Sequence, residues 1–232
     1  MRRWGIEWRW LVSMVVVLSS LGVALGSSGG IALAAGTTYT SCVQASSFPT
    51  DLANVTSGSA TFTFPADCTL DLTSSLAVAA GVSITVDGAG LVLDGQTQTF
   101  DIMKINDTLG NPSSLTLDDV TVTHGQNGIT DSGNGALITL TDSTVSDNSG
   151  DGIHANGVTG SNGEDVNVGL AGGFGGPGGA GGAVTLMNST VNDNGASGIT
   201  VNGGTGGAGG GGGLGGPDRV GGAGGNGGNG GA

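Results

Sequence analysis

The sequence predicts an all-β protein in which short strands wind into a stack of coils. The segment Ser114–Thr123 recurs in related form at Ile138–Ser146 and again at Val184–Asn192. Each copy is rich in β-branched residues and is followed by turn formers and then by a Gly-Ile pair. Self-similarity at a period of roughly 20–25 residues is typical of stacked strand repeats.

Three apolar columns run through these repeats. Their members are Leu117, Leu140 and Leu186, then Val122, Val145 and Val191, then Ile129, Ile153 and Ile199. Because stacked strands lie about 4.8 Å apart, we expect about five to six coils with a ladder core of Val, Leu and Ile. An ordinary β-sandwich would explain short strands but not aligned columns.

The first 34 residues have the features of a secretory signal peptide. Arg2, Arg3 and Arg9 precede an apolar run from Leu11 to Leu25, and Ala32–Ala34 supplies small residues for cleavage. The run is short for a membrane span, which needs about 20 residues. An uncleaved anchor is the alternative interpretation.

The charge of the chain limits its partners. It carries 18 acidic and 5 basic residues, a formal net charge of −13. Removal of residues 1–34 takes away more basic than acidic residues and makes the chain more negative. Such a chain repels nucleic acid and anionic membranes, and would contact an acidic polysaccharide only through a divalent cation.

The two cysteines, Cys42 and Cys68, predict a disulfide in an exported chain. Closing that loop would contribute about 3–4 kcal/mol to stability. Two separate buried thiols are the alternative.

Residues 35–58 are expected to cap the first coil. Thr50 is placed to begin a short helix that ends before Gly58, and Leu52 and Val55 would cover the open end of the sheet stack.

The coils are predicted over residues 59–157, with a further coil at 183–203. The strands expected before the repeats are Thr61–Phe64, Thr69–Thr73, Val82–Val86, Leu91–Leu93 and Phe100–Ile105. Asp87-Gly88 and Asp94-Gly95 are interpreted as turns, since glycine accepts positive φ at little cost.

From Cys42 to Gly203 the chain resembles the right-handed parallel β-helix proteins of the pectate-lyase-like superfamily, above all their bacterial secreted and surface members. The segments that carry the likeness are Cys42, Phe62–Phe64, Cys68, Val86–Gly95 and Leu140–Asn148. The resemblance implies a single-stranded, right-handed parallel β-helix with a capped N-terminal end. A lyase of this fold would be expected to use clustered carboxylates with calcium and a basic proton abstractor. Lys104 is the sole basic side chain within the coils, and its position between Met103 and Ile105 predicts that it faces solvent.

Two glycine-rich blocks interrupt the pattern, an insertion at 158–182 and a tail at 204–232. They resemble the repeats of mycobacterial PGRS-type surface proteins and leave the predicted coils at equivalent corners, after Asn156-Gly157 and Asn202-Gly203. We expect irregular segments, and three interpretations stay open: flexible linkers, glycine helices packed on the coils, or calcium-binding turns.

Paired acids are the candidate metal ligands. Asp119 and Asp142 share one column of the repeat, and Asp147 and Asp193 share another, so adjacent coils would bring their carboxylates close enough for calcium. The competing interpretation is that these are corner residues bonded to their own backbone. A neighbouring pair, Asn148 over Asn194, predicts an internal amide ladder.

No catalytic residue or cofactor is assigned. The first functional hypothesis is a secreted or cell-surface module with a structural, adhesive or glycan-contacting role. The second is a polysaccharide lyase or glycoside hydrolase that uses the clustered aspartates, a hypothesis that depends on fold analogy. The third is a truncated fragment without independent function.

Overall fold

A computed structural model describes residues 36–97, 99–108, 110–131, 133, 135–164, 174–211 and 226–227. The predicted signal peptide lies outside these residues. None of the helices in the described part of the chain is long and apolar enough to cross a membrane.

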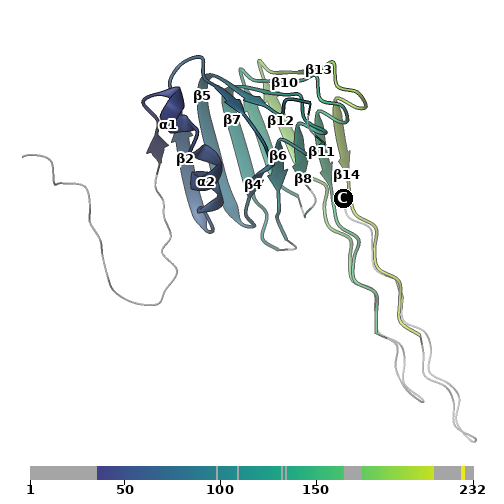
Figure 1. The fold of residues 1–232 in the computed structure, drawn as a ribbon. Coiled ribbons are helices and arrows are strands. Elements are labelled where there is room, and N and C mark those ends of the chain that lie inside the picture. The colour runs from purple at the N-terminus through teal and green to yellow at the C-terminus, as the bar shows by residue number, and fades with distance from the viewer. Residues whose placement is uncertain are drawn as a thin grey trace, which may run out of the picture. The chain divides into compact units, whose positions relative to one another are not determined.

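The protein is mostly β, with two parallel sheets (Figure 1). The first sheet contains β1 (Thr37–Thr38), β2 (Gly58–Thr63), β3 (Thr69–Asp71), β5 (Val82–Asp94), β7 (Ser114–Thr123), β9 (Leu137–Thr141), β10 (Thr144–Ser146), β12 (Ala183–Met187) and β13 (Thr190–Asn192). The second contains β4 (Leu76–Val78), β6 (Met103–Ile105), β8 (Ile129–Asp131), β11 (Ile153–Asn156) and β14 (Ile199–Asn202). From β3 onward the chain passes repeatedly between the two sheets, and each return adds strands beside those already laid down.

The strand registers confirm all three predicted columns. Leu140 pairs with Leu117 on one side and with Leu186 on the other. The valine column is formed by β7, β10 and β13, and the isoleucine column by β8, β11 and β14. Most of these side chains are fully buried, but Leu186 and Ile199, in the last strands, are 39% and 40% exposed.

The core lies between the sheets because most strands before β12 bury alternate residues. In β5, Val82, Ile84 and Val86 are buried while the residues between them are exposed or half-buried. Lys104 is exposed between buried Met103 and Ile105, as its position predicted. Parallel pairing then stacks like side chain on like side chain from one strand to the next.

Two short helices, α1 (Cys42–Ala45) and α2 (Phe48–Ala53), lie at the β2 and β4 end of the described fold (Figure 1). Phe48 packs edge-on against Phe62 and Phe64, with ring centroids 5.0 and 5.1 Å apart. Leu52 and Val55 are buried, as expected for residues that cover apolar strands. The prediction that Thr50 begins the helix is wrong. Helix α2 already starts at Phe48, because Pro49 has the fixed φ that suits a first turn.

The strand predictions before the repeats need three corrections. Val82–Val86 and Leu91–Leu93 are parts of one strand, β5, and Asp87-Gly88 does not reverse the chain. The register shifts between Asp87 and Leu91, where Ala89 and Gly90 have positive φ, so the strand bends and continues. The short strand β4 was not predicted, and the strand expected at Phe100–Ile105 is confined to β6.

The described glycine segments are hydrogen-bonded to one another. We call 157–164, 174–182 and 203–211 segments G1, G2 and G3. Backbone N–H groups of G1 donate to Asn202, Thr205 and Ala208, those of G2 donate to G1, and those of G3 donate to G2. The donors in G1 are Gly157, Gly160 and Gly163, a three-residue period that is the period of the polyproline-II helix. G1 runs parallel to G3, and both run antiparallel to G2.

Glycine recurs at every third position of this array, and at most of these positions a side chain has no room. A Cβ built on Gly157, Gly178 or Gly207 would collide with a carbonyl oxygen of a neighbouring segment. These glycines do not have left-handed φ, so space rather than conformation excludes a side chain. No helix or strand is assigned in the described parts of these segments, as expected, although their hydrogen bonds are regularly spaced. The interpretation as packed glycine helices agrees with the three-residue period, and the hydrogen bonds join the segments to one another.

Candidate functional site

The corners between strands are built from residues in the left-handed region. In addition to glycines, the residues with positive φ are Asp67, Ala89, Gln96, Thr97, Asp119, His124, Asp142, Asp147, Asn188 and Asp193. Asp and Asn tolerate this conformation better than other L-residues because their short polar side chains bond to nearby backbone. The corners thus account for many of the acids that the sequence places in columns.

All four predicted calcium ligands have positive φ, but only Asp142, Asp147 and Asp193 directly follow strands, whereas Asp119 lies within β7. Asp119 and Asp142 lie at equivalent positions, since Asp118 pairs with Thr141 and Thr121 with Thr144. Asp147 and Asp193 directly follow the register pair Ser146 and Asn192. Within the described residues, no three or more His, Cys, Asp or Glu side chains are grouped so that they could hold a metal ion. Calcium binding by these acids remains a prediction, and so does bonding of their side chains to their own backbone; what the structure shows is their positive φ.

Substitution of Asp142 separates the two roles. With φ at 47°, the corner should accept asparagine within about 0.5 kcal/mol of wild-type stability. Valine, whose branched Cβ clashes in this region, should destabilise the protein by about 1–2 kcal/mol. Urea unfolding with and without calcium measures both effects. A calcium-dependent rise in stability that Asp142→Asn abolishes would contradict the purely structural role.

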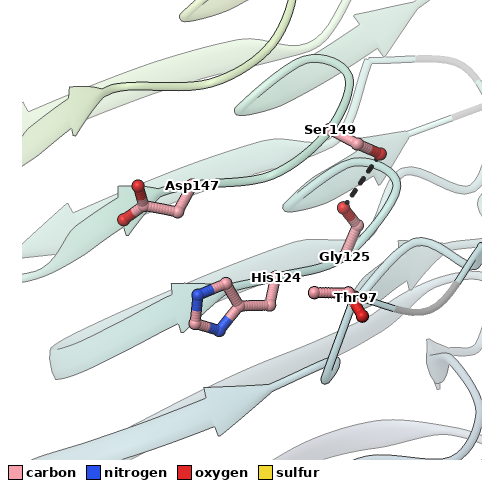
Figure 2. A pocket seen from close by; sticks show the side chains of 5 residues that line it. All are labelled: Thr97, His124, Gly125, Asp147 and Ser149. Atoms are coloured by element: carbon pink, nitrogen blue, oxygen red, sulfur yellow. Dashed lines mark hydrogen bonds between the residues drawn. The ribbon is translucent and has the colours of Figure 1, made fainter.

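A polar hollow lies beside His124, at the ends of β5, β7 and β10. Thr97, His124, Gly125, Asp147 and Ser149 line a depression of about 120 Å³ (Figure 2), which we call the His124 groove. His124 follows Thr123, and Asp147 follows its register partner Ser146, which places the two side chains on neighbouring corners.

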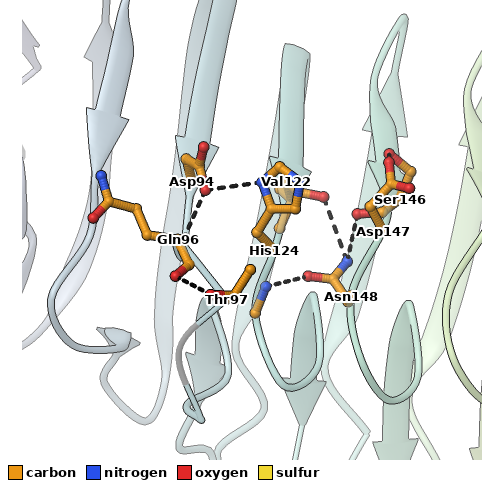
Figure 3. Close-up of polar contacts among 9 residues, drawn as sticks. Asp94, Gln96, Thr97, Val122, His124, Ser146, Asp147 and Asn148 are labelled. Atoms are coloured by element: carbon orange, nitrogen blue, oxygen red, sulfur yellow. Dashed lines mark hydrogen bonds and ion pairs between the residues drawn. The ribbon is translucent and has the colours of Figure 1, made fainter.

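Hydrogen bonds fix the groove residues in place. His124 Nδ1 lies 3.0 Å from Asp94 Oδ1, and the same oxygen accepts the Gln96 N–H at 2.7 Å (Figure 3). The imidazole is about half-exposed, so its Nε2 is left to face solvent. Ser146 Oγ donates to Asp147 Oδ2 at 2.9 Å. The groove therefore offers an oriented imidazole, carboxylate oxygens and hydroxyls within a small area.

Beneath the groove, Asn148 and Asn194 form the predicted amide ladder. Asn148 Nδ2 donates to Asn194 Oδ1 at 3.0 Å. Asn148 Oδ1 accepts the N–H of Gly125 at 2.9 Å (Figure 3). Asn194 Nδ2 in turn donates to the carbonyl of Val145. Because each amide bonds to the backbone of the preceding corner, the ladder stiffens the base of the groove.

A second aspartate–histidine pair, Asp151 and His154, lies on the outer face of the second sheet. His154 Nδ1 is 2.6 Å from Asp151 Oδ2, and Asp151 Oδ1 accepts the N–H of Ser197 at 2.8 Å. Burial raises the pKa of Asp151, but the hydrogen bonds from His154 and Ser197 outweigh it and hold the pKa below its ordinary value. His154 pairs in register with Thr130 and Thr200.

Sequence reasoning missed both aspartate–histidine pairs. Asp151 and His154 are three residues apart. That spacing indicates a contact only when the backbone conformation between the two residues is known. Asp94 ends β5, and His124 follows the last residue of β7. Their contact could be anticipated only from the register, in which Asp94 pairs with Thr123, the residue before His124.

The predicted disulfide is present. Cys42 and Cys68 are joined with an Sγ–Sγ distance of 2.03 Å, and the bond ties α1 to the segment before β3. It links the helical end of the fold to the first sheet.

Comparison with known proteins adds no relative. No family model, no curated protein and no solved structure matches this chain. The fold and its sites define a mostly β protein with two parallel sheets and a disulfide, and function is argued from its residues alone.

Proposed function

We propose that this chain is an exported, right-handed parallel β-helix with a structural or adhesive role, which contacts neutral glycans through the His124 groove. Three features support a β-helical path of the chain. The strands are parallel, the chain passes repeatedly between two sheets, and like residues stack in register. A right-handed sense is expected because crossovers between parallel strands take that hand almost always.

Export is supported by the disulfide and by the signal-like first 34 residues. Disulfides persist in oxidising compartments and are rare where cellular thiols keep cysteines reduced. A surface location, most simply on a bacterium, follows from the resemblance described above and is part of the proposal.

The observation that carries glycan contact is the set of fixed polar groups in the groove. His124 is oriented by Asp94, and the Asp147 carboxylate and the Ser149 hydroxyl lie beside it. Sugar hydroxyls both donate and accept hydrogen bonds, which matches this mixture of donors and acceptors. The net charge of −13 favours neutral over acidic glycans.

Retention on immobilised neutral polysaccharides tests the proposal. His124→Asn removes the imidazole but keeps a residue that tolerates the corner, so it should weaken retention roughly tenfold if one or two hydrogen bonds are lost. Asp193→Asn is the matched control, since Asp193 occupies the same corner column outside the groove. Equal retention of wild type and both variants would contradict a glycan contact at His124, and so would no retention at all.

The same samples test the enzymatic alternative. The contact between His124 and Asp94, with Asp147 on the next corner, is a geometry in which acid–base chemistry is possible. Reducing sugar released by wild type and not by Asp147→Asn would replace the adhesive proposal with a hydrolase.

A further inference from the structure

A second cavity lies where G1 leaves the second sheet, away from the His124 groove. It has a volume of about 400 Å³, and its lining residues are Thr130, Asp131, His154, Asn156, Gly157, Val158 and Thr159. Strands β8 and β11 supply its wall, and the first residues of G1 form its rim. The volume falls within the range of roughly 300–1,000 Å³ that is common for small-molecule sites.

One polar atom in this cavity wall is unusual. Thr130 Oγ1 is buried and has no hydrogen-bond partner among the described residues. A buried hydroxyl without a partner is destabilising, and such groups in native proteins call for an explanation. Because Thr130 lines the cavity, a ligand there could supply the hydrogen-bond partner that its hydroxyl lacks, after a rotation about χ1 to another staggered position where needed.

Further groups in the cavity have unused hydrogen-bonding capacity. Asn156 Oδ1 accepts from Asn202 Nδ2 at 3.0 Å, and one N–H of its amide points to His154 Nε2, which leaves the second N–H available. Thr159 Oγ1 accepts from Thr205 at 3.2 Å and retains its own hydrogen as a donor. Val158, 37% exposed, adds an apolar surface at the rim.

The charges around the cavity decide the class of ligand. Asp131 is fully buried, and its two carboxylate oxygens accept the N–H groups of Gly133 at 2.9 Å and Ala136 at 3.2 Å. Asp151, bonded to His154, is close by in sequence and structure. An anionic ligand would meet these carboxylates, so a neutral ligand with several hydroxyls fits best.

We propose that this cavity binds a neutral polyhydroxylated ligand, such as one sugar ring, with Thr130 and Asn156 as hydrogen-bonding residues and Val158 against its C–H face. Thr159 contributes a hydroxyl from the glycine segment. The site is separate from the His124 groove, so this proposal does not depend on glycan contact at that groove.

The test uses the whole disulfide-bonded chain and defined probes. The probes are methyl glucoside, methyl mannoside and methyl galactoside, with glucuronate as the anionic probe and ethanolamine as the cationic one. Binding is followed by saturation-transfer NMR and calorimetry. Thr130→Val removes the hydroxyl at nearly constant volume, and Thr139→Val, on β9 of the other sheet, is the matched control.

Wild type and Thr139→Val should bind at least one neutral glycoside equally well, and Thr130→Val should bind it roughly tenfold more weakly. The thermal midpoint of Thr130→Val should be unchanged or higher, because the lost hydroxyl has no partner in the protein. A purely structural threonine would instead lower the midpoint and leave binding intact. Undiminished binding by Thr130→Val, no binding of any neutral probe, or binding of a charged probe alone would overturn the proposal. His124→Asn should leave this binding unchanged. Failure of the cavity proposal is thereby distinguished from failure of the glycan contact proposed at the His124 groove.

Discussion

Replacement of Leu140 by alanine should lower the free energy of unfolding by about 2–5 kcal/mol, the range for large-to-small changes in packed cores. Leu140 is fully buried, with Leu117 on one side and Leu186 on the other, so neither neighbour is free to fill the cavity. Denaturant unfolding followed by circular dichroism gives the difference directly.

Leu186→Ala is the matched control, because it makes the same change one strand further along the same column. Leu186 is already 39% exposed, and its truncation should cost only about 1 kcal/mol. Equal losses at the two positions would mean that the column does not end at β12 as described. A small loss at Leu140 would mean that it is not a core residue.

Replacement of Gly207 by alanine should disrupt the array formed by G1, G2 and G3. The new Cβ would collide with the carbonyl oxygen of Ser161, and a rigid backbone atom yields less easily than a side chain. We expect a local cost of about 1–3 kcal/mol, as for other overpacked sites, which corresponds to a factor of roughly 5 to 150 in local opening.

Amide hydrogen exchange reports that opening. The N–H groups of Gly204 and Gly207 donate to Gly179 and Gly176, and their exchange should accelerate in Gly207→Ala. Gly203→Ala makes the same change at an exposed position and should leave exchange unaltered. Exchange at the rate of an unstructured chain in wild type would show instead that the segments are independent linkers.

The sequence was sufficient for the parts of the fold that depend on periodicity. Leu117, Leu140 and Leu186 could be aligned because parallel stacking repeats the same side-chain environment at each return of the chain. Asn148 and Asn194 could be paired for the same reason. Residues such as Asp119 and Asp142 were harder to interpret, because corner formation and metal binding favour the same side chain at the same place.

Features that depend on non-repeating contacts were not predictable. Asp87-Gly88 has the composition of a turn, and only pairing with β7 shows that β5 continues through it. The glycine array arises from contacts between segments far apart in sequence, such as Gly157 with Asn202 and Gly207 with Gly176, and glycine carries no side chain to reveal the partner. Its signal was the strict glycine at every third position, as in Gly204, Gly207 and Gly210. The pairing of Asp94 with His124 likewise needed the strand order.

The central claim is that successive returns of the chain stack leucine over leucine between two parallel sheets. Leucine-methyl NMR tests it most directly, in a sample with only the leucine methyl groups labelled and protonated. The account predicts cross-relaxation between Leu117 and Leu140 and between Leu140 and Leu186, with a much weaker contact between Leu117 and Leu186. Absence of the first two contacts, in a folded sample with the disulfide intact, would contradict it.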